Sequence, residues 1–242
     1  MTSAPDRIEE TSAWGARLGV VAGITDRATG SLGFWTGEPV GQVMRRWREL
    51  RHGLAPRFPA LVMAHQVHGA RVLWHEGVAP GWHLTDGADG HATRQRGVML
   101  AVTVADCVPI YLAASDATVA ALLHAGWRGV AAGMLEAGVT TITERTGVPP
   151  SALAVHCGVA ICGKCYEVGP EVVAGVLGRR AAGPERLDLR GALAARAAAL
   201  GISDVSASPW CTSCHQDRFY SHRGSRGADT SRQIGLLGIP AA

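Results

Sequence analysis

The stretch from Val98 to Gly129, VMLAVTVADCVPIYLAASDATVAALLHAGWRG, decides the fold of this chain. Two apolar runs rich in β-branched residues, 98–104 and 118–123, each end at a short polar cluster. Short runs of this composition favour buried strands over helices. The clusters that follow them are Ala105-Asp106-Cys107 and His124-Ala125-Gly126-Trp127-Arg128-Gly129. Because strand ends hold side chains rigidly, we expect a thiol and an imidazole to be fixed in one site here.

Length and composition fit a single domain over residues 1–242. The chain has 47% hydrophobic residues, enough to bury a core without disulfides, and no linker, charge run or internal repeat divides it. Residues 1–13 are expected to be a flexible leader. They carry acids where a secretory signal needs a basic and then an apolar region, and the chain has no apolar run of membrane-spanning length. We therefore expect a cytoplasmic protein that does not enter a membrane.

The net charge and the cysteine content limit which binding partners and which cysteine roles can be expected. The net charge is only +3, and most basic residues are arginines scattered among acids, which gives no electrostatic case for nucleic acid. A few well-placed arginines can still bind a small anion. Without an export signal, the six cysteines are expected to be thiols or metal ligands rather than a disulfide framework.

Outside the opening stretch, strands and helices alternate. We expect strands at 17–22, 60–63, 71–74, 153–156 and 204–208, a last strand or short extension at 234–237, and helices at 40–51, 128–144, 170–177 and 189–200. The segments 76–97 and 157–168 are rich in glycine or cysteine and are expected to be irregular. Asp89 lies in the first of these, where a turn role is the simpler interpretation and a role in a site the less common one.

A first set of candidate ligands is His68, Cys107 and His124. His68 is preferred to His65 because Gly69 allows close backbone approach. Catalytic zinc typically has three protein ligands of these types and one open position. Two other interpretations remain: a buried thiol with structural histidines, or a metal-free pair in which His124 activates Cys107 as a nucleophile.

A second set is formed by the motifs Cys162-x-x-Cys165 and Cys211-x-x-Cys214. Paired motifs of this kind commonly build a structural zinc site, although the separation between these two is longer than usual. Neither motif opens a helix after a strand as in thioredoxin-like proteins, which disfavours a redox pair. Unpaired thiols or partial disulfides are the remaining alternative.

Four arginines are candidate anion ligands. Arg128 lies at the expected start of a helix, where free N–H groups and a guanidinium could bind phosphate or a carboxylate. Arg223 resembles it because aromatic and small residues surround it in the sequence. Arg27 and Arg232 complete the set, although surface or ion-pairing roles are common for such residues.

Together these residues resemble the YfiH family, also described as laccase-domain or polyphenol oxidase proteins, zinc-dependent purine nucleoside phosphorylases and peptidoglycan editing factor. The shared motifs are QVHG (66–69), DGHAT (89–93), VTVADCVPIYL (102–112), LHAGWRG (123–129), CYEVGPEV (165–172), LDL (187–189), CTSC (211–214) and FYSHR (219–223). The resemblance runs from about residue 17 to the C-terminus.

This resemblance implies an α/β (α+β) fold, a layered sandwich of mixed β-sheets flanked by helices and related to cysteine-hydrolase-like domains. It implies zinc bound by His68, Cys107 and His124. Family members are associated with phosphorolysis of adenosine, inosine and methylthioadenosine and with deamination of adenosine. The expected partners are thus a purine nucleoside and phosphate. The expected substrate or phosphate contacts are Arg128, Arg223, Arg27 and Gln66, with Asp106 either orienting a ligand, shuttling a proton or capping a turn.

Two stretches depart from the family pattern. Where GPxIGPCCYEV is usual, Lys164 replaces one thiol and Cys162 is gained, and where SYRR is usual the chain reads Ser221-His222-Arg223-Gly224. Alternative functions are an amidase that removes a wrong amino acid from peptidoglycan precursors, a copper polyphenol oxidase, and a non-enzymatic scaffold. Copper is disfavoured because coupled copper centres need many imidazoles, and the sequence has no His-x-His pair.

Overall fold

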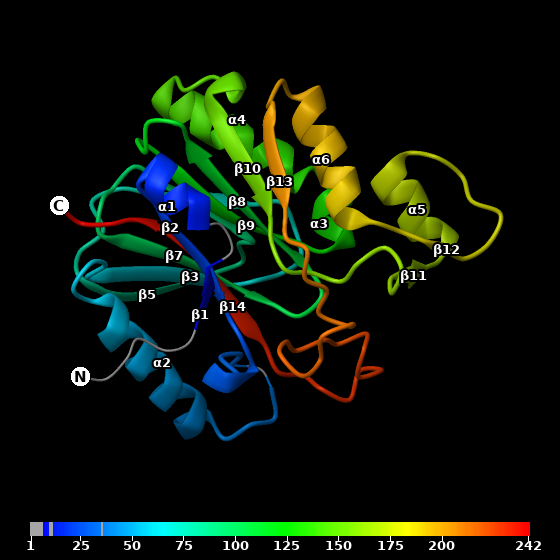
Figure 1. Ribbon diagram of the computed structural model, residues 1–242, viewed down its shortest axis with the longest axis horizontal. Helices are drawn as coiled ribbons and strands as arrows, with labels where there is room; N and C mark the ends of the chain where they lie inside the picture. Colours follow the sequence, from blue (N-terminus) through cyan, green and yellow to red (C-terminus); the bar gives the residue numbers. More distant parts are fainter. Residues whose placement is uncertain (1–6, 10–11, 35) are drawn as a thin grey trace.

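The computed structural model describes residues 7–9, 12–34 and 36–242. Two six-stranded mixed sheets stack face to face, and helices cover their outer faces (Figure 1). Sheet A contains, in spatial order, β1 (Arg7–Glu9), β2 (Val21–Thr25), β14 (Gln233–Ile239), β7 (Val98–Val104), β3 (Ala60–His65) and β5 (Gly81–Asp86). Sheet B contains β13 (Asp204–Ala207), β10 (Leu153–Cys157), β8 (Val108–Ala114), β9 (Ala120–Ala125), β6 (Gly90–Thr93) and β4 (Val72–His75).

The helices pack on the outer faces of the two sheets, except for the first, which contributes Trp14 and Leu18 to the core between them. They are α1 (Ser12–Leu18), α2 (Val40–Leu54), α3 (Trp127–Ala131), α4 (Met134–Thr146), α5 (Pro170–Leu177) and α6 (Leu189–Ala199), with 3-10 turns η1 (Arg27–Thr29) and η2 (Pro150–Ala152). Helix α2 packs on the outer face of sheet A, whereas α3, α4, α5 and α6 pack on that of sheet B. A small pair, β11 (Glu167–Val168) and β12 (Glu185–Arg186), lies beside α5. This arrangement confirms the expected layered fold.

The strands within the stretch 98–129 are almost fully buried on both faces, which is why their apolar runs are continuous. Along β7, Leu100 and Val102 face sheet B, and Met99 faces helix α2 on the other side. Along β8, Tyr111 faces sheet A, where its hydroxyl donates a 3.0 Å hydrogen bond to the Gly23 carbonyl. Successive side chains of a strand point to opposite faces, so one apolar run contributes to two separate cores.

Several expected elements are confirmed. Strand β7 and helix α5 have the bounds that the sequence predicted, and α6 begins after Asp188, whose side chain accepts a hydrogen bond from the Arg190 amide as an N-cap. The expected strand at 118–123 is β9, which runs two residues further and so contains His124. Among the described residues, no helix combines the length and the apolar character needed to cross a membrane.

The N-terminal prediction is wrong. The expected strand at 17–22 is instead the end of helix α1, a break at Gly19 with φ of 65°, and the start of β2. Trp14 and Leu18, four residues apart, both pack into the core between the sheets, so helical spacing prevails there. Part of the expected flexible leader is also regular, because β1 pairs with β2. Residues 1–6 and 10–11 of that leader lie outside the described part.

Three further predictions need correction. The segment 76–97 contains β5 and β6: β5 is a partly exposed edge strand, and β6 is short and polar, so neither gives a strong pattern. The helix expected at 128–144 is two helices, because Gly133 adopts φ of 82° between α3 and α4. Strand β8 was not anticipated as a separate element.

Candidate metal centre and substrate pocket

His68, Cys107 and His124 come together at the ends of three different strands. His68 follows β3 in a loop with φ of 59°, Cys107 lies in the β7–β8 turn, and His124 lies near the end of β9. Strands β8 and β9 are antiparallel, so the start of one adjoins the end of the other. One ligand atom from each residue lies within 4.8 Å of the others, and the two imidazole rings are 4.8 Å apart between centroids. The geometry brings together the three residues chosen from the sequence.

Asp89 holds this group in position. Its carboxylate accepts a 2.9 Å hydrogen bond from His124 Nδ1, and it also accepts the backbone amides of Val67, His68 and Gly69 at 2.8–3.1 Å. The residue is fully buried. Burial favours the neutral acid, but the hydrogen bonds from His124 and Gly69 outweigh it and lower the pKa of Asp89. The carboxylate thus fixes one ligand directly and another through its loop.

Charge coupling makes Cys107 an anion in the metal-free protein. Burial opposes ionisation of the thiol, yet the adjacent His124 and His68 lower the pKa of Cys107 to about 6. Burial likewise opposes protonation of His124, while the Cys107 thiolate and Asp89 raise the pKa of His124 to about 9. A thiolate and a neutral imidazole are the forms that bind metals, and the cluster supplies the first of them at neutral pH.

The donor set fits a metal ion with one open position. Two imidazoles and a thiolate match zinc-type ligation, and Asp89 supplies the outer carboxylate that commonly orients a ligating histidine. The space beside these ligands is also too small for an added side chain at position 126. A Cβ atom on Gly126 would lie 2.9 Å from the Cys107 sulfur and 3.3 Å from His68 Cδ2, so only glycine fits beside the cluster.

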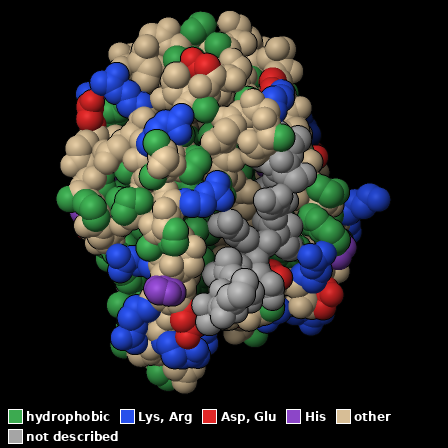
Figure 2. Space-filling model, turned by 60° about the vertical axis from the view of Figure 1, so that its left-hand side comes forward, with side chains coloured by type: hydrophobic (Ala, Val, Ile, Leu, Met, Phe, Trp, Pro, Cys, Tyr) green, Lys and Arg blue, Asp and Glu red, His purple; other side chains and the backbone are tan. Residues whose placement is uncertain are grey.

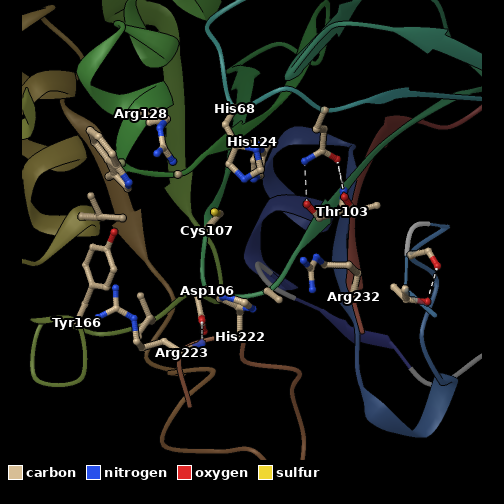
Figure 3. Close-up of a pocket in the computed structure, with 18 of the residues that line it drawn as sticks. His68, Thr103, Asp106, Cys107, His124, Arg128, Tyr166, His222, Arg223 and Arg232 are labelled. Atoms are coloured by element: carbon tan, nitrogen blue, oxygen red, sulfur yellow. Dashed lines mark hydrogen bonds between the residues drawn. The ribbon is translucent and has the colours of Figure 1, made fainter. Parts of the chain in front are cut away.

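The three ligands lie on the wall of a cavity of about 490 Å³. Figure 3 shows Arg128 on the same side of the cavity as the two histidines, and Tyr166, Arg223 and His222 lower down. The Arg128 guanidinium lies 4.5 Å from the Trp127 ring centroid and makes no hydrogen bond to the described residues. Arg223 lies 5.2 Å from the Tyr166 ring and donates a 2.6 Å hydrogen bond to the Glu167 carbonyl. The cavity therefore combines a candidate metal centre with two arginine guanidinium groups.

Two predicted substrate contacts have other partners. Arg27 does not line this cavity: it donates to Asp229 at 2.8 Å, lies over the Tyr220 ring and lines a different cavity. Gln66 does line the cavity, but Thr103 occupies its amide. Gln66 Nε2 donates to the Thr103 carbonyl, and Gln66 Oε1 accepts from the Thr103 amide and hydroxyl at 2.7–2.9 Å. Gln66 therefore fixes the loop that carries His68.

Asp106 holds the C-terminal loop against the metal centre. Its carboxylate accepts hydrogen bonds from the Thr212 and Ser221 hydroxyls, both at 2.6 Å, and from the Arg223 amide at 2.7 Å. It lies in the β7–β8 turn with φ of 81°, next to Cys107. These contacts match the turn-capping alternative better than a proton shuttle, because the donors already occupy both oxygens.

Sequence reasoning undervalued Asp89 and missed Tyr166. Asp89 stands in a turn-like stretch, and only its position before a short strand that runs beside β9 marks it. Tyr166 follows Cys165 in the loop expected to be irregular, and its ring forms part of the cavity wall. Burial raises the pKa of Tyr166 to about 12, so its hydroxyl keeps its proton at neutral pH.

Fold and site together define a class, an α/β protein with a candidate His–Cys–His metal centre on a cavity of small-molecule size. The chain matches, over residues 17–240, the family described as multi-copper polyphenol oxidoreductase laccase, and it belongs to this laccase-domain or YfiH family. This confirms the resemblance seen in the sequence.

Several relatives are named as enzymes that act on purine nucleosides. The purine nucleoside phosphorylase ORF3 of Streptomyces griseus is 36% identical over 83% of this chain and 82% of its own length. The purine nucleoside phosphorylase YlmD of Geobacillus stearothermophilus is 34% identical over 91% of this chain and 90% of its own. The adenosine deaminase RL5, from an unknown prokaryotic organism, is 29% identical over 89% of both chains.

Solved structures show the same architecture. The crystal structure of YlmD from Geobacillus stearothermophilus superposes with a TM-score of 0.82 and 31% identity over 92% of both chains. YfiH from Bacillus licheniformis gives a TM-score of 0.84 over 98% of this chain and 97% of that one, at 24% identity. The second likeness concerns the fold alone.

Proposed function

We propose that this protein is a zinc-dependent purine nucleoside phosphorylase that cleaves adenosine, inosine and methylthioadenosine and also deaminates adenosine. One observation carries the proposal: His68, Cys107 and His124 converge on the same cavity as Arg128. The relatives named as purine nucleoside phosphorylases and adenosine deaminase support the substrate class. The phenol oxidase alternative is weaker, because the candidate ligand groups among the described residues are one His–Cys–His set and one four-cysteine set.

His68, Cys107 and His124 would hold the zinc ion, which would supply Lewis acidity to a substrate oxygen or nitrogen atom in the cavity. Arg128 binds phosphate through the fork of its guanidinium, which makes no hydrogen bond to the described residues. Phe34, Trp127 and Ile161 offer apolar surface for the purine ring. In phosphorolysis a phosphate oxygen attacks the ribose C1′ carbon, the bond to the base nitrogen breaks, and the departing base takes up a proton.

Small molecules are the proposed partners, in the cytoplasm. None of the six cysteines, all of which the structure describes, forms a disulfide, and this suits a reducing compartment. On the face in Figure 2, basic side chains are spread among hydrophobic and uncharged ones, and several have an acidic neighbour. Such mixed charge does not favour a phosphate backbone, so we do not propose a nucleic acid partner.

The test is turnover of adenosine by zinc-loaded protein, with and without phosphate, followed by chromatography of adenine, hypoxanthine and ribose 1-phosphate. We expect phosphate-dependent base release that the His124→Ala variant lacks. Arg128→Ala should raise the KM for phosphate by about 10- to 100-fold, the effect of losing a charge-assisted hydrogen bond. Arg45→Ala is the control, because Arg45 pairs with Glu49 on the exposed face of α2. Zinc-loaded protein that leaves nucleosides intact would contradict the proposal.

The amidase alternative is favoured by one observation, the ionised Cys107 beside a protonated His124 in the metal-free protein. A thiolate of this kind could attack an amide carbonyl of a peptidoglycan precursor. The metal state of the protein separates the two reactions. Amide cleavage by the metal-free wild type that disappears in Cys107→Ser, together with no nucleoside cleavage by the zinc-loaded wild type, would favour the amidase.

A further inference from the structure

We propose that Cys162, Cys165, Cys211 and Cys214 bind a structural zinc ion, separate from the centre at His68, Cys107 and His124. The four sulfur atoms all lie within 4.8 Å of one another, and those of Cys165 and Cys214 are 3.4 Å apart. Zinc bound to four thiolates at about 2.3 Å holds the sulfurs about 3.8 Å apart. The spacing in the protein is close to that of a tetrahedral four-cysteine site.

The sheet brings the two motifs together. Strands β10 and β13 are parallel neighbours, with Cys157 opposite Ala207, so the loops that leave them start from the same edge of sheet B. A parallel bridge between Ala160 and Cys211 extends this pairing into the loops. The long sequence separation between the motifs is therefore no obstacle, because rigid strands rather than a short linker set their distance.

Each motif folds back so that its two thiols share one side. The Cys165 amide donates to the Cys162 carbonyl at 3.0 Å, and the His215 amide donates to the Cys211 carbonyl at 3.0 Å. Two further amides donate to the Cys211 sulfur, that of Cys162 at 3.2 Å and that of Cys214 at 3.4 Å. Cys211 is buried, and two amide donors on one buried sulfur stabilise a thiolate, the form that binds metal.

Two arginines donate hydrogen bonds to backbone carbonyls next to the two motifs. Four thiolates and one zinc ion carry a net negative charge, which is costly near a core unless compensated. Arg190 is buried and donates to the carbonyls of Ser208 and Trp210 at 2.6 and 2.8 Å, directly before Cys211 in the chain. Arg186 donates to the carbonyl of Lys164, between the two cysteines of the other motif.

The site would brace the wall of the substrate cavity. Tyr166, which lines the cavity, directly follows Cys165. Thr212, inside the second motif, donates to Asp106 beside the Cys107 ligand. One ion joining these two loops would therefore hold both parts of the wall, and this role does not depend on the reaction the cavity performs.

Metal analysis of the full-length protein, purified under reducing conditions with zinc, tests the proposal. We expect about two zinc ions per chain in the wild type and about one in either His124→Ala or the double variant Cys165→Ser/Cys214→Ser. Combining all three changes should leave none. Cys157→Ala is the control, since this buried thiol belongs to neither cluster, and it should retain both ions. A double variant that binds as much zinc as the wild type would overturn the proposal.

A second measurement covers the case in which the double variant fails to fold. Zinc-loaded wild-type protein is titrated with an organomercurial while a chromophoric dye records the released zinc. One ion should leave as four thiols react, whereas the other should leave with the single thiol of Cys107. Disulfides among the four cysteines in freshly reduced protein, or the release of one ion only, would refute the site. Neither measurement uses nucleoside turnover, so its outcome is independent of the proposed function.

Discussion

At the residue scale, a single carboxylate orients two residues of the candidate metal centre. Asp89 orients His124 through Nδ1 and fixes the 67–69 loop through three amides, so it acts on two of the three ligands. Asp89→Asn retains the size but removes the charge and one acceptor. We expect metal affinity to fall by about 10- to 100-fold, the usual effect of losing such an outer carboxylate. Competition with a chromophoric chelator measures it.

Asp86→Asn is the matched control for this change. Asp86 accepts a 3.0 Å hydrogen bond from His65 but is largely exposed and lies outside the cavity. Its replacement should leave metal affinity unchanged. Equal affinities for Asp89→Asn and the wild type would show that the buried carboxylate does not orient the ligands.

Gly126 provides a second prediction at this scale. Its φ of −76° suits any residue, so the need for glycine comes only from the space beside Cys107 and His68. Gly126→Ala should displace the sulfur and lower metal affinity by at least about tenfold, a cost of about 1.4 kcal/mol. Gly41→Ala, where an added Cβ meets nothing within 4 Å, is the control. Chelator competition on both proteins decides, and unchanged affinity in Gly126→Ala would contradict the argument.

At the element scale, strands β4 and β6 hold a histidine pair, of which one member is buried and the other half-buried. His75 Nε2 lies 2.9 Å from His91 Nδ1, and His91 is fully buried. Burial lowers the pKa of His91 to about 3 and that of His75 to about 4, with the nearby His83 also lowering the latter. The unfolded chain binds protons below a pKa of about 6.5, so it takes up more protons than the folded chain does. Stability should therefore fall as pH falls from about 6.5 to about 4.

Urea unfolding at several pH values within this window measures the effect. We expect the free energy of unfolding to decrease by up to about 1.4 kcal/mol per pH unit for each histidine. The double variant His75→Gln/His91→Gln should flatten this dependence, whereas replacing the exposed His52 with Gln should not. A slope that persists in the double variant would assign the acid sensitivity to other groups.

The sequence predicts those elements that have a strong local pattern of apolar residues or a clear helix start. Strand β7 is buried on both faces and α5 begins at Pro170, so the sequence predicts the position of each. Strand β5 was missed because it lies at a sheet edge with intermediate and exposed residues, which weakens any periodic signal. Helix α1 was missed because Trp14 and Leu18 pack between sheets formed by distant segments.

The candidate site also contains some residues that a local pattern predicts and others that depend on distant segments. His68, Cys107 and His124 could be predicted because each follows or ends an apolar run and has metal-ligand chemistry. The partner of Arg27 could not, since Asp229 lies 202 positions away and no local pattern links the two. The local sequence around Asp89 indicates a turn, and only the pairing of β6 with β9 shows that Asp89 lies beside the end of β9. Contacts between distant segments, rather than residue type, therefore limit which site residues can be predicted from the sequence.

At the scale of the whole molecule, the last strand completes the first sheet. Strand β14 lies between β2 from the N-terminal part and β7 from the middle, and it pairs with both (Figure 1). All seven of its residues are buried. Sheet A thus stays divided until the C-terminal segment is in place, and the cores on both of its faces depend on that segment.

A chain ending after Arg232 should therefore fail to fold cooperatively. It loses the buried side chains of Ile234, Leu236, Leu237 and Ile239, at about 1.5–3 kcal/mol each. Their sum, about 6–12 kcal/mol, is as large as the whole stability of a typical protein, about 5–15 kcal/mol. A chain ending after Pro240 retains β14 and the Arg96 hydrogen bond to Pro240, so it should unfold in a sharp thermal transition. Near-ultraviolet circular dichroism compares the two, and cooperative unfolding of the shorter chain would mean that β2 and β7 do not require the strand between them.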